Sequence, residues 1–153
     1  MLREVHTSDI AILFTHQLDP TSNWQVAFTH EDPTDENGFN EHISKVLVDE
    51  TVFMKTIIFN SEVAGYITKY ELDGAPQIGF VLGREFWGKG LATQALREFL
   101  LLISERPIYA RTAFDNDGSI RVLQKLGFVR TSEGDYYSHA RGVEIVEIFW
   151  TLD

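Results

Sequence analysis

The residues best suited to chemistry lie in a glycine-bearing turn that joins a predicted strand to a predicted helix. Gly88, Gly90 and Ala92 carry little or no side chain, so a ligand can approach the backbone closely there. The first amide groups of a helix lack partners within the helix, and the helix dipole makes that end attractive to anions. Lys89 and Arg84 add positive charge to the same segment of an acidic chain. The segment therefore predicts a diphosphate site, although a tight strand-to-helix corner would need the same small residues.

A second strand-to-helix junction begins at Asn116 and includes Ser119. Taken alone, both residues are most simply explained as helix caps. Two such junctions can nevertheless flank one ligand from two sides, and the sequence leaves both interpretations open. Neither standard nucleotide motif is present. The chain has no P-loop, and Thr93 stands after Gly88 and Gly90 where a dinucleotide motif needs a third glycine.

The strands and helices that position these two junctions can be predicted from the pattern of apolar residues along the chain. Alternating apolar residues predict seven strands, at about residues 2–6, 51–59, 63–72, 77–82, 108–115, 128–139 and 143–152. Helical spacing predicts four helices, one beginning after residue 8 and the others at about 39–49, 90–105 and 118–126. The polar segment 19–38 is expected to be a packed loop, and Gly134 is expected to mark a break or bulge in its strand. Hairpins joined by one or two helical crossovers are typical of an α+β protein.

Composition excludes several classes of function. The 153 residues are predicted to form one domain, spanning residues 1–153. Thirteen basic against 23 acidic residues give a net charge of −10, which argues against a nucleic-acid partner. The absence of cysteine excludes disulfides, thiolate zinc sites and a cysteine nucleophile. No apolar run approaches the roughly 20 residues of a membrane span and the first residues lack a secretory pattern, so we expect a cytoplasmic protein with no membrane partner.

The two junctions together resemble the motifs of the GNAT family of N-acetyltransferases. The family's phosphate-binding motif, (Gln/Arg)-x-x-Gly-x-(Gly/Ala), is matched at Gly90 and Ala92, while Trp87 stands where Gln or Arg is usual. That replacement resembles the subgroup of ribosomal-protein N-terminal (alanine/serine) acetyltransferases, in which Tyr-Trp-Gly-x-Gly is common and residues 86–90 here read Phe-Trp-Gly-Lys-Gly. The same subgroup carries Asn-x-x-Ser-x-x-Val-Leu-x-x-x-Gly-Phe, which residues 116–128 match in register.

This resemblance implies an acyl-CoA N-acyltransferase fold: a mixed, mostly antiparallel sheet of about seven strands flanked by about four helices. It also implies an acetyl-CoA-dependent N-acetyltransferase that needs no metal. Acetyl-CoA would lie between the strand near residues 80–83 and the strand near residues 109–114, with its pyrophosphate on the amides of the glycine turn. The cofactor-binding residues implied are Phe80, Val81, Gly83, Trp87, Gly88, Lys89, Gly90, Leu91, Ala92, Thr93, Asn116 and Ser119.

Asn116 and Ser119 are also the catalytic residues that the resemblance implies, with Asn116 on the pantetheine arm and Ser119 close to the sulfur. Many members use a Tyr on this helix as the general acid, but Leu123 stands at that position here. The role must then pass to Ser119, to a water molecule or to no group. We favour Ser119, because a hydroxyl beside the sulfur can donate a proton or a hydrogen bond.

The general base is left open by the sequence. Many members place a Glu on the strand before the phosphate turn, but this strand offers only Gln77. The other candidates are Glu31, His30, Glu71, Asp73, Glu85, Tyr136 and His139, and each is more simply explained as a surface or packing residue. A base is unnecessary if the amine arrives partly neutral and positioning contributes most of the rate.

The acceptor is expected to be a primary amine of a small molecule or of a protein N-terminus. Segment 31–50 contains seven acidic residues and one lysine, a charge of −6 that would attract a cationic amine. A solvated helix face explains the same charges equally well. Trp24 and Phe28 either cover the acceptor or anchor their loop to the core, and we expect anchoring. A CoA-binding domain without catalysis remains the alternative, and the sequence allows a monomer or a homodimer.

Overall fold

A computed structural model describes residues 1–153, in which seven strands form one sheet. The strands are β1 (Leu2–Arg3), β2 (Phe53–Phe59), β3 (Glu62–Leu72), β4 (Ala75–Leu82), β5 (Ile108–Ala113), β6 (Val129–Ser138) and β7 (Val143–Leu152). They lie in the order β1-β2-β3-β4-β5-β7-β6, and every neighbouring pair is antiparallel except β4 and β5. The predicted mixed, mostly antiparallel α+β sheet is therefore confirmed.

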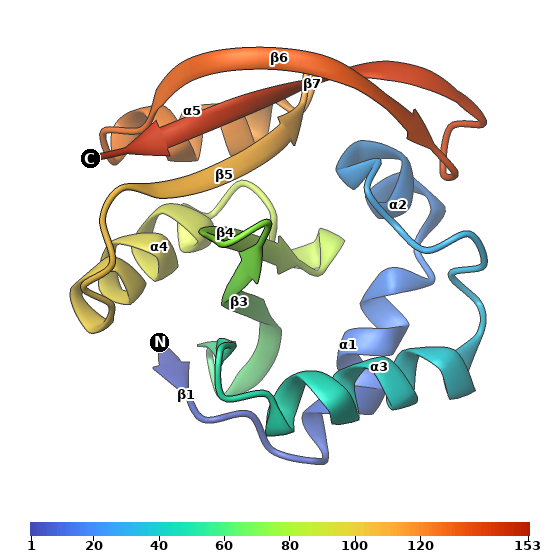
Figure 1. The fold of residues 1–153 in the computed structure, drawn as a ribbon. Helices are drawn as coiled ribbons and strands as arrows, with labels where there is room; N and C mark the ends of the chain where they lie inside the picture. The colour runs from blue at the N-terminus through green and yellow to red at the C-terminus, as the bar shows by residue number, and fades with distance from the viewer.

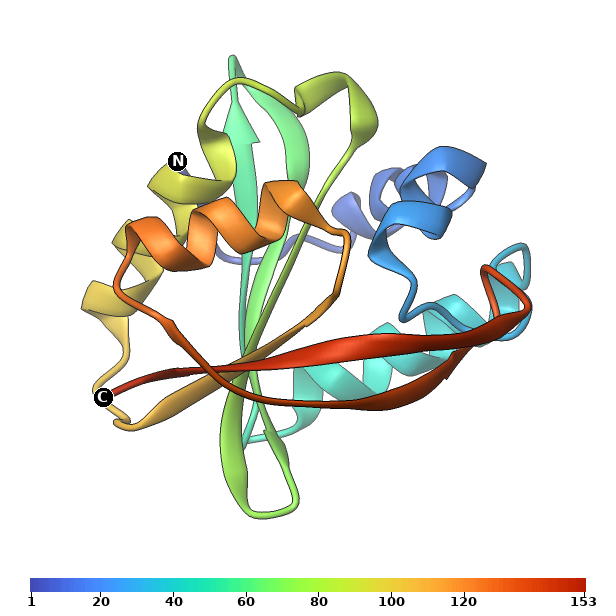
Figure 2. The same ribbon diagram turned by 90° about the horizontal axis from the view of Figure 1, so that it is seen from above.

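Helices cover both faces of this sheet. They are α1 (Asp9–Gln17), α2 (Pro20–Val26), α3 (Glu36–Val48), α4 (Leu91–Leu102) and α5 (Asp117–Lys125), with one 3₁₀ turn, η1, at Arg84–Phe86. Figure 2 shows α4 and α5 on one side of the sheet and α1, α2 and α3 on the other. None of the helices combines the length and the apolar character needed to cross a membrane.

The two largest of three buried apolar clusters lie between these layers. The larger one lies between the sheet and the α4–α5 layer and includes Ile67, Phe99 and Trp150. The smaller one joins α1 and α3 to β2 and β3, and in it the rings of Phe14 and Phe39 lie 5.4 Å apart. Full burial of such a side chain contributes about 1.5–3 kcal/mol to stability. Both faces of the sheet are thus covered by packed helices, which fixes where the loops at its edges lie.

The sheet opens in its middle, between β4 and β5. A single register pair, Gln77 with Tyr109, joins these two parallel strands, whereas β3 and β4 pair over the whole length of β4. Helix α4 supplies the crossover that a parallel pair requires. Figure 1 shows that the β3–β4 part and the β5–β7–β6 part run in clearly different directions. The edge of β4 beyond Gln77 therefore has no partner strand.

The prediction that segment 19–38 is a packed loop is wrong in part, because α2 occupies Pro20–Val26 and α3 begins at Glu36. Asp19 caps α2, its carboxylate accepting a hydrogen bond of 3.0 Å from the Thr21 amide, and Pro20 follows where its fixed φ suits a helix start. The helix ends at Val26 and is followed by the cap residue Ala27, which has a φ of 67°. Seven residues are too few to show an apolar stripe, so periodicity missed this helix.

Two smaller expectations are also corrected. The irregularity in β6 falls between Arg130 and Ser132 and not at Gly134. Gly134 instead leaves room for the Phe149 ring, which would come within 3.3 Å of a Cβ there. Trp24 does not anchor its segment in the core, because it is 49% exposed.

Candidate functional site

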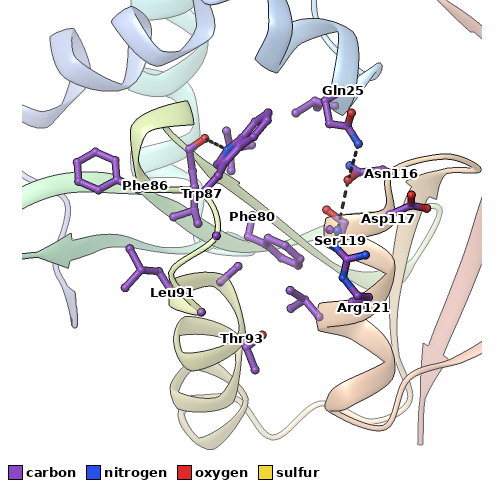
Figure 3. A pocket seen from close by; sticks show the side chains of 18 of the residues that line it. Gln25, Phe80, Phe86, Trp87, Leu91, Thr93, Asn116, Asp117, Ser119 and Arg121 are labelled. Atoms are coloured by element: carbon purple, nitrogen blue, oxygen red, sulfur yellow. Dashed lines mark hydrogen bonds between the residues drawn. The ribbon is translucent and has the colours of Figure 1, made fainter.

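The two strand-to-helix junctions converge on one cleft with a volume of about 540 Å³. One wall is the carboxyl half of β4 with the start of α4, and the other is the start of α5, while α2 closes the end (Figure 3). This volume is typical of a site for a small molecule or cofactor. The predicted residues that line it are Phe80, Val81, Trp87, Gly88, Gly90, Leu91, Ala92, Thr93, Asn116 and Ser119.

Gly83 and Lys89 do not line the cleft, although the resemblance implied that they would. The backbone of Gly83 is already used within the protein, since its amide donates to the Ala64 carbonyl at 2.8 Å and its carbonyl accepts from the Phe86 amide at 2.9 Å. The ring of His16 lies directly against Gly83, and a Cβ there would be 2.7 Å from Nε2 of that ring. Gly83 is therefore a close contact between β4 and α1.

The turn before α4 has the geometry of an anion site. Gly88 and Gly90 both have a φ of 75°, a conformation that glycine adopts without strain. No side chain caps α4, so its first amides are free to bind a ligand. The Trp87 indole donates a hydrogen bond of 3.1 Å to the Leu82 carbonyl and so ties the turn to the end of β4. Trp87 thus has a structural role where Gln or Arg is usual.

Arg84 does not add its charge to this turn, contrary to the prediction. Its guanidinium lies 3.7 Å from the Asp19 carboxylate and lines a separate, smaller cleft with His16 and Glu85. Burial lowers the pKa of His16 there, and the negative charge of Glu85 opposes that effect. Positive charge in the main cleft comes instead from Arg121 and Lys125, which the sequence reasoning missed. Their spacing of one helical turn on α5 is the signal that would have placed both on one face.

Asn116 both caps α5 and lines the cleft. Its side-chain oxygen accepts a hydrogen bond of 3.3 Å from the Ser119 amide and one of 3.2 Å from Gln25 Nε2, as the dashed lines in Figure 3 show. The cap is therefore confirmed, and a role in ligand binding stays a prediction that this position in the cleft allows. With the oxygen engaged twice, the amide NH₂ is the group left to donate to a ligand. The Ser119 side chain is half-buried beside it.

A clasp of five residues joins this junction to α2 and to the turn between β6 and β7. Arg141, in the turn between β6 and β7, forms two hydrogen bonds of 2.9 Å with the Asp115 carboxylate. Its Nε donates to the Trp24 carbonyl at 2.9 Å, and its guanidinium lies 3.8 Å from the centre of the Trp24 ring. Gln25 completes the clasp through its bond to Asn116. These contacts join segments far apart in sequence, so no local pattern could reveal them.

None of the candidate general bases named from the sequence lines the cleft. Gln77 is buried at the point where β4 meets β5, and Glu85 faces the smaller cleft. The rings of His30 and His42 lie 5.4 Å apart, and burial is the main cause that lowers the pKa of His42. The only carboxylate among the lining residues is Asp117, which the sequence reasoning did not select.

The acidic segment 31–50 also lies outside the cleft lining. Asp32, Asp35 and Asp49 accept hydrogen bonds from backbone amides two or three residues further along, so they stabilise local turns and the start of α3. Glu41 forms an exposed pair with Lys45 at 3.5 Å. These contacts support the interpretation of the segment as a solvated surface.

Comparisons with known proteins agree with this geometry. Residues 1–129 match the family described as acetyltransferase (GNAT) domain. A curated relative, the uncharacterized N-acetyltransferase p20 of Bacillus licheniformis, is 28% identical over 81 residues, which cover 50% of this chain and 45% of that protein. The match thus spans less than half the length of this relative.

Two solved structures share the fold over 99% of this chain. The ribosomal-protein-alanine N-acetyltransferase from Brucella melitensis is 17% identical, with a TM-score of 0.83 and 98% of its chain covered. The spermidine N-acetyltransferase from Vibrio cholerae, in complex with CoA and spermine, is 15% identical, with a TM-score of 0.81 and 94% covered. The family match over residues 1–129 confirms the resemblance seen in the two motifs: the chain belongs to the GNAT family of acetyltransferase domains.

Proposed function

We propose that this chain is an N-acetyltransferase that moves the acetyl group of acetyl-CoA to a primary amine by direct attack. The observation that carries this proposal is the cleft in the opened sheet. It has an uncapped helix start with two left-handed glycines at one end and the Asn116–Ser119 junction at the other. A thioester cofactor needs a phosphate site and a separate acyl site in this arrangement.

The cleft residues match the chemistry of CoA along its length. The free amides at the start of α4 would bind the pyrophosphate, and Arg121 and Lys125 supply positive charge to the phosphates. The edge of β4 beyond Gln77 has no partner strand, so its backbone groups can bind the amides of the pantetheine arm. Phe80 and Val81 lie on that edge and line the cleft, where they would contact the acyl end of the cofactor.

The residues at the acyl end suit a direct transfer. Attack of the amine nitrogen on the thioester carbon forms a C–N bond and places negative charge on the carbonyl oxygen, which backbone amides of β4 would stabilise. The C–S bond then breaks, and the Ser119 hydroxyl would donate a proton to the departing thiolate while its oxygen regains one from the N–H of the attacking nitrogen, directly or through a water molecule. The Asn116 NH₂ would hold the pantetheine arm, because its oxygen is already engaged by Gln25 and the Ser119 amide.

A CoA-binding domain without catalysis is the second candidate, and one observation favours it. Leu123 stands where many family members have a catalytic Tyr, and its side chain is packed in the core with 1% exposure. None of the candidate bases lines the cleft either. Asn116 and Ser119, the two residues proposed to act on the thioester, do line the cleft, and this favours an active enzyme.

Turnover separates the two candidates. The protein should be mixed with acetyl-CoA and, in separate reactions, with spermidine, alaninamide and a peptide with an N-terminal alanine, while free thiol is followed. We expect amine-dependent thiol release with at least one acceptor. CoA binding without release for any of them would favour the inactive domain. We also propose that residues 1–153, whose strands form one sheet, act as a single domain in the cytoplasm.

A further inference from the structure

Gln25, on the short helix α2, lines the main cleft beside Asn116. Its Nε2 donates a hydrogen bond of 3.2 Å to Asn116 Oδ1 and a longer one of 3.5 Å to the Asp115 carbonyl. Both partners are oxygen atoms, so the opposite orientation of the Gln25 amide would place oxygen against oxygen. Gln25 therefore meets the start of α5 as a hydrogen-bond donor (Figure 3).

The orientation of the Asn116 amide depends on what its oxygen binds. The two ends of this amide have nearly the same size, but only the NH₂ end can donate a hydrogen bond. The cap bond from the Ser119 amide to Asn116 Oδ1 is 3.3 Å long, beyond the usual range of about 2.7–3.2 Å. Gln25 gives the same oxygen a second donor, and an amide turned by 180° would set its NH₂ against both donors. The two bonds together therefore leave the Asn116 NH₂ free for a ligand.

Arg141 fixes the backbone next to both members of this contact. Its Nε donates to the carbonyl of Trp24, the residue before Gln25, at 2.9 Å. Its two terminal nitrogens bind the carboxylate of Asp115, the residue before Asn116, at 2.9 Å each. Helix α2 and the start of α5 are thus joined at two consecutive residues on each side. The Gln25 side chain is presented to Asn116 from a backbone that is already held in place.

A role in stability alone does not account for the Gln25 contact. Asn116 already caps α5 through the Ser119 amide, and Arg141 already joins α2 to the start of α5. The Gln25 side chain is half-buried in the wall of the cleft, so without it a water molecule would satisfy the Asn116 oxygen. Such a water molecule would keep the junction folded but would not hold the Asn116 amide in one orientation. The contribution of Gln25 is therefore expected in ligand binding more than in folding.

Resting on the proposed function, we propose that Gln25 is a positioning residue for the cofactor and acts through Asn116. It keeps the Asn116 NH₂ turned toward the pantetheine arm, whose amide carbonyls accept hydrogen bonds. A donor that is oriented before the ligand arrives lowers the cost of ordering it on binding. Helix α2, which has no direct contact with the phosphate turn among the hydrogen bonds of the protein, thereby belongs to the part of the site that holds the arm.

The test measures the binding of two probes by the wild type, Gln25→Ala and Gln17→Ala. One probe is CoA, and the other is 3′-phospho-ADP, which carries the phosphates of CoA without the pantetheine arm. Gln17 is the matched control, because its side chain donates one hydrogen bond of 3.0 Å to the Pro33 carbonyl and does not line the cleft. We expect Gln25→Ala to weaken CoA binding by about tenfold, as the loss of one oriented hydrogen bond implies, and to leave 3′-phospho-ADP binding unchanged. Gln17→Ala should bind both probes as the wild type does.

The isosteric variant Gln25→Glu gives a second measurement. It keeps the size of the side chain, but its ionised carboxylate cannot donate a hydrogen bond and would face the oxygen atoms of Asn116 and Asp115. CoA binding should then be at least as weak as in Gln25→Ala. Steady-state kinetics of both variants should show a raised KM for acetyl-CoA with kcat nearly unchanged. Wild-type affinity for CoA in Gln25→Glu would overturn the proposal.

The outcomes separate this inference from the proposed function. Equal CoA affinity in wild type and Gln25→Ala, together with amine-dependent thiol release, would overturn the role of Gln25 and leave the function standing. Equal losses for CoA and 3′-phospho-ADP would also overturn it, because they would show a general disturbance of the cleft. A loss confined to CoA, in a protein that releases no thiol with any amine, would support the role of Gln25 and contradict the transfer reaction.

Discussion

At the scale of single residues, Gly90 and Gly74 form a natural pair for comparison. Their φ angles are 75° and 78°, and both positions have open space for a Cβ. Aspartate costs about 1 kcal/mol of backbone strain at either position. We expect Gly90→Asp to lose acetyl-CoA binding, because the new carboxylate faces the phosphate site, while Gly74→Asp binds normally. A thermal shift with acetyl-CoA measures both, and retained affinity in folded Gly90→Asp would refute the assigned phosphate site.

Ser119 offers a second test at the same scale. The helix cap is made by the Asn116 side chain, so the Ser119 hydroxyl is not needed to start α5. We expect Ser119→Ala to lower kcat by about 100-fold, the usual contribution of a general acid, and to leave acetyl-CoA affinity nearly unchanged. Steady-state kinetics with a saturating amine measure the effect. Unchanged kcat would show that another group protonates the thiolate.

Asp9 gives a prediction about stability and pH. This buried carboxylate accepts hydrogen bonds from Arg3 at 2.7 and 2.8 Å, and from the His6 amide and Thr56 Oγ1 at 2.8 Å each. The bonds from Arg3, followed by those from His6 and Thr56, lower its pKa to about 2 despite its burial. A lowered pKa stabilises the fold above the unfolded value near 3.8, and that contribution is lost as the pH falls through about 2.

Asp9→Asn should therefore cost about 2 kcal/mol of unfolding free energy at pH 7. The difference from wild type should shrink steadily as the pH is lowered from about 5 toward 2. Urea denaturation of both proteins across this range measures it. A difference that stays constant with pH would show that the ionised carboxylate is not what stabilises the fold here.

At the scale of elements, the clasp around Arg141 joins the β6–β7 hairpin to α2 and to the start of α5. The Arg141 side chain is only 5% exposed and carries a bidentate bond to Asp115. Removing one partner of such a pair leaves a charge without compensation, so we expect Arg141→Ala to lower the unfolding free energy by about 3 kcal/mol. Arg130→Ala is the control, because Arg130 forms an exposed pair with Glu133 on the same hairpin. Equal, small losses in both variants would mean that the clasp does not hold these elements together.

The elements also show how far the sequence could predict this structure. The bounds of long segments such as α4 and β7 were predicted within a few residues. One face of each is buried, so apolar residues recur along the sequence with the period of the helix or strand. Helix α2 was missed, since a short helix with one buried residue leaves no such pattern. In the cleft, the glycine turn and the cap at Asn116 are local motifs and could be found. Gln25 reaches the site only through the tertiary fold, which brings α2 against the start of α5.

At the scale of the whole molecule, the cleft is a consequence of the sheet. Strands β4 and β5 pair once and then separate, so the start of α4 and the start of α5 face each other across the opening. The net charge of −10 is carried largely by exposed groups such as Glu41, while Arg121 and Lys125 line the cleft. This distribution lets an acidic protein attract a phosphate-bearing ligand to one place.

Binding of acetyl-CoA tests the central claim most directly. The melting temperature of the protein should be measured with acetyl-CoA, ATP and NAD offered separately. A ligand at about 100 times its dissociation constant adds about 2.7 kcal/mol to the stability of the folded state, which is easily seen as a higher melting temperature. We predict a clear rise with acetyl-CoA and none of comparable size with ATP or NAD. No rise with acetyl-CoA, or an equal rise with all three, would contradict the assignment of the cleft as an acetyl-CoA site.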